Sequence, residues 1–246
     1  KRRMCMKKVK IIGISLIAIL LLSVGGFLIW SSITYKPTEE LMGEVTKFDL
    51  QSTNEDLIWE GSNGTGIILY AGAKVEHAAY AYYAEQLAQQ GYTVILPSIR
   101  LNFALLDANA AEEYINLYPE IDTWIVGGHS LGGVAAAMFA QNHDDVDGLI
   151  LLGSYPSESS NLSKDSINVL SLYAQFDGLT SLEDIETSKA LLPPDTTFIE
   201  IQGGNHAQFG MYGEQKGDQK ATISAKQQQD IMVEDTINWL EAMHKK

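Results

Sequence analysis

The longest apolar stretch of the chain lies near its start, at residues 11–30. It contains no charged residue, and at about 1.5 Å per residue a helix of this length spans the roughly 30 Å hydrocarbon layer of a bilayer. The pattern therefore predicts a transmembrane helix. A buried core helix is the weaker alternative, because such a helix normally shows a polar face or helix breakers within this length.

Further along the chain, short apolar runs alternate with segments of helical periodicity. Near-continuous apolar strands separated by helices indicate a parallel sheet that is covered on both faces and joined by right-handed crossovers. The sequence therefore predicts an α/β fold with a mostly parallel central sheet. The predicted strands are 44–50, 57–60, 67–71, 93–97, 124–127, 148–152, 168–176 and 197–202, and the predicted helices are 76–90, 105–118, 131–141, 181–191 and 224–244.

These patterns divide the chain into a basic segment (1–10), the membrane helix (11–30), a linker (31–43) and one α/β domain (44–246). A domain of this size buries enough apolar surface to fold without disulfides or metals. The single cysteine, Cys5, cannot form an internal bridge. The glycine-rich segment 61–66 precedes a strand and lacks the Lys-Ser/Thr ending of a phosphate-binding loop, so we expect it to be a turn.

Charge is unevenly distributed along the chain. The formal net charge is −14, and the six basic residues among the first ten leave −20 on the remainder. The positive-inside rule then places the N-terminus in the cytoplasm and the α/β domain outside. The alternative is a cleaved signal peptide and a secreted domain, but the apolar run exceeds the usual roughly 7–15 residues and no clear cleavage site follows it. Nucleic acid is not an expected partner of so acidic a domain.

Ser130 lies in Gly127-Gly128-His129-Ser130-Leu131-Gly132-Gly133, between a predicted strand and a predicted helix. At such a junction the Gly-x-Ser-x-Gly spacing indicates a tight, strained turn, in which side chains at positions 128 and 132 would collide with neighbouring backbone. The turn projects the serine into the cleft, so Ser130 is the predicted nucleophile. An inert serine in a glycine-rich turn is the alternative. We expect His129 to point away from the nucleophile's partner and to pack or line the pocket.

A serine hydroxyl becomes a nucleophile when an imidazole accepts its proton and a carboxylate orients that imidazole. Asp177 directly follows the strand predicted at 168–176, so its carboxylate should emerge at the carboxyl edge of the sheet. Glu183 and Asp184 are weaker alternatives, because they fall in the first turn of the next predicted helix, where acids interact favourably with the helix dipole.

His206 is the predicted base, because it lies on a glycine-containing loop directly after the last predicted strand. The order Ser130, Asp177, His206 is the order found in α/β-hydrolases. The oxyanion of a tetrahedral intermediate requires two donors. We expect the backbone N–H of Leu131 and, from the loop after 67–71, that of Ala73, with Lys74 as second choice. The remaining histidines, expected on the surface, are His77, His143 and His244.

Three runs of sequence resemble the small bacterial "alpha/beta hydrolase fold-5" group, which is related to dienelactone hydrolases. They are Tyr70-Ala71-Gly72-Ala73-Lys74-Val75, the segment 127–133, and Gly203-Gly204-Asn205-His206-Ala207-Gln208-Phe209-Gly210, and the resemblance covers about residues 66–243. It implies an α/β-hydrolase fold, a hydrolase activity and a triad of Ser130, Asp177 and His206. Dienelactone hydrolases proper have a cysteine nucleophile, where this chain has serine.

The sequence thus predicts a membrane-anchored serine hydrolase that cleaves a carboxylic ester, lactone or thioester through an acyl-enzyme on Ser130. The expected partners are a small-molecule or cell-envelope ester and the membrane. No cofactor or metal is expected, since no histidine pair has metal-ligand spacing. The alternatives are an acyltransferase with the same acyl-enzyme and a tethered binding protein without catalysis. The loops 98–106, 154–166 and 209–221 are too short for a lipase-type lid, which favours an open pocket and small or exposed esters.

Overall fold

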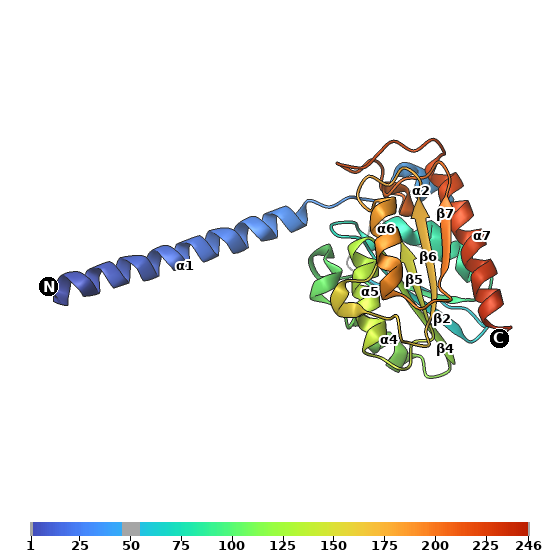
Figure 1. Cartoon of the computed structure of the whole chain (residues 1–246). Helices are drawn as coiled ribbons and strands as arrows, with labels where there is room; N and C mark the ends of the chain where they lie inside the picture. The colour runs from blue at the N-terminus through green and yellow to red at the C-terminus, as the bar shows by residue number, and fades with distance from the viewer. Residues whose placement is uncertain (1, 46–54, 246) are drawn as a thin grey trace. The chain divides into compact units, whose positions relative to one another are not determined.

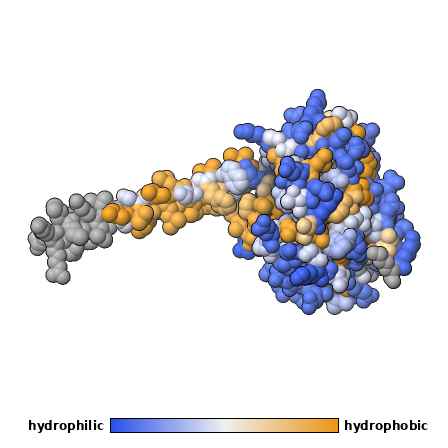
Figure 2. All heavy atoms as spheres, in the orientation of Figure 1, coloured by the Kyte–Doolittle hydropathy of each residue, from blue (hydrophilic) through white to orange (hydrophobic). Residues whose placement is uncertain are grey.

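The computed structural model describes residues 2–45 and 55–245, and the chain forms two compact units, Lys1–Thr34 and Tyr35–Lys246. The first unit is one helix, α1 (Arg2–Ser32), of which Ile12–Ser32 is long and apolar enough to cross a membrane. Its apolar side chains are exposed, and Figure 2 shows them as a hydrophobic surface along the helix. Its length, its composition and its place near the N-terminus fit both a membrane anchor and a signal sequence.

The second unit is built on one seven-stranded sheet with the order β1-β3-β2-β4-β5-β6-β7 (Figure 1). The pairing of β1 with β3 is antiparallel, and all other pairs are parallel. The strands are β1 (Leu57–Trp59), β2 (Thr65–Tyr70), β3 (Thr93–Leu96), β4 (Thr123–His129), β5 (Gly148–Leu152), β6 (Asn168–Ala174) and β7 (Thr197–Ile201). The mostly parallel α/β fold predicted from the sequence is confirmed.

Two layers of helices bury the faces of this sheet. Helices α3 (Ala81–Ala88) and α7 (Ala225–Met243) pack in one apolar cluster with the strand residues that point to their face of the sheet, such as Ile67. Helices α4 (Ala110–Leu117) and α5 (Leu131–Gln141) pack in a second cluster with the strand residues that point to the opposite face, such as Ile68. Both faces of the central strands are therefore apolar, which explains their near-continuous hydrophobic sequences. Figure 1 shows α7 and α5 on opposite sides of the strands.

The segment between the apolar helix and the sheet differs from the prediction. Within the predicted linker, Tyr35 forms a β-bridge with Val75, and α2 (Glu39–Glu44) buries Leu41 completely. These contacts make the compact unit begin at Tyr35. The strand predicted at 44–50 is not supported at Glu44, which ends α2, and residues 46–50 lie outside the described part of the chain.

Two long helices predicted from periodicity are each interrupted. The first consists of the 3-10 turn η1 (His77–Tyr80) followed by α3, and the second of η3 (Ala104–Leu106) followed by α4. The last helices begin where expected, because α6 (Leu182–Ser188) and α7 each follow a serine that forms a capping box.

The order of the strands changes direction at β2. From β2 the chain moves outward to β3 and then returns to β4 on the other side of β2, with Tyr70 paired to Gly128 at their carboxyl ends. Ligand sites of open α/β sheets form at such a topological switch point. The loop after β2 and the turn after β4 therefore meet at this edge.

Candidate active site

Ser130 connects β4 to α5 and has a backbone conformation that L-residues rarely adopt, with φ 52° and ψ −123°. Its backbone groups are fixed on both sides. The Ser130 N–H donates to the carbonyl of Leu152 at 3.0 Å, and its carbonyl accepts from the N–H of Gly133 at 3.0 Å and from the Ser154 hydroxyl at 2.6 Å. Strain of this kind persists where surrounding structure determines the conformation.

The glycines around Ser130 are required by close backbone packing. A Cβ at Gly128 would collide with the backbone of Gly132, and a Cβ at Gly132 would lie 2.5 Å from the carbonyl oxygen of Ala71. Both collisions are those expected of a tight strand-to-helix turn. A Cβ at Gly133 would lie 2.5 Å from the Ser154 hydroxyl, so this glycine allows the bond between Ser154 and the Ser130 carbonyl.

His206 and Asp177 form a buried pair. The distance from His206 Nδ1 to Asp177 Oδ2 is 2.8 Å, and each side chain is 1% exposed. The other carboxylate oxygen, Oδ1, accepts from the N–H groups of Leu179 at 2.8 Å and Thr180 at 2.6 Å, which fixes the carboxylate. A carboxylate acceptor at Nδ1 leaves Nε2 as the basic nitrogen. His206 Nε2 is buried and has no hydrogen-bond partner among the residues that the structure describes.

The three predicted residues lie at the same edge of the sheet. The His129 ring, next to Ser130 in sequence, lies 4.4 Å from the His206 ring between centroids. Gly153 lines the cleft together with Ser130, and a Cβ there would lie 3.1 Å from Asp177 Oδ2. Within the described residues no hydrogen bond joins Ser130 Oγ to His206 Nε2. In free enzymes this bond is often long and tightens when substrate binds.

The loop after β2 has one backbone N–H group that could donate a hydrogen bond to an oxyanion. Gly72 N–H donates to the Tyr80 hydroxyl at 3.0 Å, and Lys74 N–H donates to the Asn102 carbonyl at 2.7 Å. Ala73 N–H, between them, has no acceptor within residues 2–45 and 55–245, and neither does Leu131 N–H at the start of α5. The geometry therefore favours Ala73 over Lys74 as the partner of Leu131.

The predicted direction of His129 is wrong, although its packing role is right. The side chain turns toward His206, and its Nδ1 lies 2.8 Å from the Tyr80 hydroxyl. That hydroxyl accepts from Gly72 and has its own proton to give to His129. Burial holds the pKa of His129 well below its usual value, nearby His206 lowers it further, and the His206 backbone offsets part of the shift. His129 is therefore neutral at neutral pH.

The cleft beside Ser130 has a volume of about 200 Å³ and is lined by residues including Leu131, Tyr155 and Leu179. An adjoining hollow of about 310 Å³ shares Tyr155. A larger hollow of about 460 Å³ lies around residues 140–147 and 162–168, at the opposite end of α5 from Ser130. Among the described residues, no group of three His, Cys, Asp or Glu side chains could hold a metal ion.

The alternative acids have structural roles. Asp184 forms the capping box of α6 with Ser181, and Glu183 lies in the first turn of that helix, as expected of dipole-interacting acids. Sequence reasoning missed Tyr80, Ser154 and Asp218. Only Ser154 carried a local signal, because it begins a loop that follows a predicted strand at the same edge of the sheet.

Comparisons with known proteins agree with the fold. The model of a family described as "Alpha/beta hydrolase family" matches residues 66–230. A structure from work on the metagenome-derived lipolytic enzymes LipS and LipT is 13% identical, with a TM-score of 0.57 over 79% of this chain and 99% of that chain. An esterase from Thermogutta terrifontis is 14% identical, with a TM-score of 0.55 over 77% and 94%. No protein with a curated function matches the sequence.

Proposed function

The chain belongs to the alpha/beta hydrolase family, and on this premise we propose that it is a membrane-anchored serine hydrolase that cleaves a carboxylic ester. The observation that carries the proposal is the buried bond between His206 and Asp177, at the same sheet edge as a strained serine between β4 and α5. An imidazole held in this way is poised to accept the proton of the serine hydroxyl. Similar structures described as esterases and lipolytic enzymes support the choice of an ester.

In the acylation step, Ser130 Oγ attacks the ester carbonyl carbon and its proton passes to His206 Nε2. The Oγ–C bond forms, and the π electrons of the carbonyl group move to its oxygen. This oxyanion accepts hydrogen bonds from the backbone N–H groups of Ala73 and Leu131. Collapse of this intermediate breaks the bond to the alcohol oxygen, which takes the proton from Nε2. Asp177 keeps Nδ1 protonated and stabilises the imidazolium throughout.

In the deacylation step, water replaces the alcohol. His206 Nε2 takes a proton from the water as the hydroxyl oxygen attacks the acyl carbon, and the same two N–H groups stabilise the second oxyanion. The bond to Ser130 Oγ then breaks, and Nε2 returns the proton to Oγ. The products are a carboxylic acid and an alcohol, and the enzyme is restored.

The cleft supports a small acyl group. Its volume of about 200 Å³ is below the roughly 300–1,000 Å³ of pockets that enclose drug-sized ligands. The adjoining hollow of about 310 Å³ beyond Tyr155 offers room for the second half of the substrate. We therefore expect acetyl and butyryl esters to be cleaved faster than esters of long fatty acids.

The proposed location is the outer side of the cytoplasmic membrane. The exposed apolar side chains of Ile12–Ser32 fit a bilayer, and the six basic residues among the first ten, ahead of this apolar part of α1, fit a cytoplasmic N-terminus. Protease added to cells stripped of their wall should then digest the catalytic unit while the membrane stays intact. Protection of that unit would refute the orientation, and recovery of the unit in the medium without α1 would indicate signal cleavage.

The proposed chemistry is tested by labelling the full-length protein in detergent with a fluorophosphonate, which reacts with activated serines. Wild type should be labelled and should hydrolyse nitrophenyl acetate. Ser130→Ala should not be labelled, and His206→Ala and Asp177→Asn should be labelled at least about 10²-fold more slowly.

His244→Ala is the matched control, because it removes an imidazole near the C-terminus and should react at the wild-type rate. Equal labelling of Ser130→Ala would refute the assignment of the nucleophile. An unlabelled and inactive wild type, correctly folded, would leave the chain as a binding protein with this fold.

A further inference from the structure

The loop that follows His206 carries an acidic side chain with an unusual set of partners. Its carboxylate, that of Asp218, accepts hydrogen bonds from four backbone N–H groups, which belong to three different segments of the chain. Oδ1 accepts from Gly178 at 2.9 Å, from His206 at 3.3 Å and from Gln219 at 2.8 Å, and Oδ2 accepts from Ala207 at 2.8 Å.

Two of these segments carry the proposed catalytic pair. Gly178, the donor of the first segment, directly follows Asp177, and the donors of the second segment are His206 itself and Ala207. One carboxylate thus bridges the loop after β6, which carries the acid, and the loop after β7, which carries the base. We propose that Asp218 is a positioning residue that fixes the distance between Asp177 and His206, an inference that rests on the proposed function.

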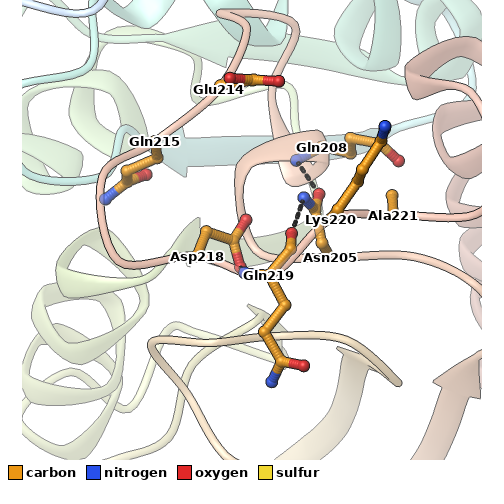
Figure 3. A pocket seen from close by; sticks show the side chains of 8 residues that line it. All are labelled: Asn205, Gln208, Glu214, Gln215, Asp218, Gln219, Lys220 and Ala221. Atoms are coloured by element: carbon orange, nitrogen blue, oxygen red, sulfur yellow. Dashed lines mark hydrogen bonds between the residues drawn. The ribbon is translucent and has the colours of Figure 1, made fainter.

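The packing of the loop supports this role. A Cβ at Gly178 would lie 2.7 Å from the Gly217 carbonyl oxygen and 2.8 Å from the Gln219 nitrogen, so the backbone around Asp218 lies directly against the residue after Asp177. Such an approach leaves no room for a side chain at position 178. Figure 3 shows Asp218 on this loop, at the border of a hollow of about 300 Å³.

The base loop has further hydrogen bonds that do not involve the Asp218 carboxylate. Asn205 Nδ2 donates to the Gln219 carbonyl at 2.7 Å, and the Gln228 side chain on α7 both accepts from Asn205 N–H and donates to its carbonyl. Loss of the Asp218 carboxylate would therefore leave the loop attached to α7. The expected consequence is a shift of His206 relative to Asp177, with the fold retained.

Bonds to a carboxylate are charge-assisted and about twice as strong as neutral ones. Asp218→Ala removes all four. Asp218→Asn keeps one carbonyl oxygen and turns an N–H₂ donor toward an N–H donor, so at least one bond is lost. Glu214 lines the same hollow on the same loop, and no hydrogen bond joins its side chain to any residue that the structure describes. Glu214→Ala therefore removes an equal charge as a matched control.

The experiment compares these variants with wild type, all full-length in detergent. Steady-state hydrolysis of nitrophenyl acetate is normalised to the folded concentration, which circular dichroism measures. The pair is also observed directly by the low-field proton resonance of His206 Nδ1–H bonded to Asp177. A misplacement on the order of 1 Å costs about 10²-fold in rate.

Asp218→Ala should therefore lower kcat by about 30- to 100-fold while KM changes by less than about twofold, and the low-field resonance should move or disappear. Asp218→Asn should lower kcat by about 3- to 10-fold, and Glu214→Ala should change neither value by more than about twofold.

The proposal fails if folded Asp218→Ala keeps kcat and the resonance of wild type. If that variant does not fold, Asp218→Asn decides, and wild-type kcat and resonance there would refute the role. The two proposals fail separately. A wild type that neither turns over nor reacts with fluorophosphonate refutes the serine hydrolase, whereas the resonance still tells whether Asp218 holds His206 against Asp177.

Discussion

Replacement of Ser130 by glycine should abolish the proposed reaction and yet make the protein more stable than replacement by alanine. Both variants lose the hydroxyl, for which the structure records no hydrogen bond among the described residues. They differ in how well they tolerate the local backbone, because φ 52° and ψ −123° are disfavoured for any residue with a Cβ. The comparison therefore isolates the strain in the turn.

The size of the effect follows from two opposing contributions. A non-glycine residue held in a sparsely populated backbone region costs about 1–3 kcal/mol, and glycine removes this cost. Glycine also gives the unfolded chain more freedom, which lowers stability by about 0.5–1 kcal/mol. The two contributions together span about 0–2.5 kcal/mol, and we expect the free energy of unfolding of Ser130→Gly to exceed that of Ser130→Ala by about 1 kcal/mol. For a protein of this size, about 1 kcal/mol corresponds to about 2–4 °C in Tm.

The assay is thermal unfolding of the full-length variants in detergent, followed by near-UV circular dichroism. Ser166 supplies a matched control, because it is an exposed serine in a loop and is not among the residues with positive φ. There, glycine should be less stable than alanine. If Ser130→Gly melts at or below the temperature of Ser130→Ala, the strain in the turn does not exceed the entropic cost of glycine, and the predicted difference in stability is refuted.

Two further predictions concern the residues behind the site. Tyr80→Phe removes the buried hydroxyl that bonds both Gly72 N–H and His129, so it should lower the free energy of unfolding, measured by urea titration, by about 1–3 kcal/mol and lower kcat by about tenfold. Unchanged values of both would contradict this. Burial lowers the pKa values of His77 and His129 in the folded chain. As the pH falls below about 6.5, these two histidines therefore take up protons in the unfolded chain while they stay neutral in the folded chain. Stability should then fall by up to about 1.4 kcal/mol per pH unit for each histidine, and a His129→Gln slope equal to that of wild type would refute its share.

The parts of the fold and site that local patterns determine could be predicted from the sequence. Strand β5 and helix α5 were found at their observed bounds, because continuous apolar runs and small-residue helices reflect burial on a parallel sheet. Ser130, Asp177 and His206 could be selected because Ser130 directly follows β4 and the other two lie on the loops after β6 and β7. The topology of a parallel sheet brings such positions to one edge, whatever their separation in sequence.

The residues that were missed depend on contacts between distant segments. Asp218 lies in a loop without regular structure, and its partners are defined only when that loop packs against Gly178. The direction of His129 is determined by Tyr80, from a 3-10 turn that periodicity had assigned to a longer helix. In the same way, no pattern between the apolar helix and β1 indicated that Tyr35 pairs beside Val75.

Asp177 and Asp218 both bind backbone N–H groups, and their variants should fail for different reasons. In Asp177→Asn, Oδ1 can still accept from Leu179 and Thr180, so the loop keeps its position while an N–H₂ group faces His206 Nδ1. Nδ1 must then accept, the proton moves to Nε2, and the base is lost with the geometry intact. In Asp218→Ala, we expect His206 to keep its proton on Nδ1 but to lie at the wrong distance from Asp177. Fluorophosphonate labelling should therefore be abolished more completely in Asp177→Asn, although its Tm should be closer to that of wild type.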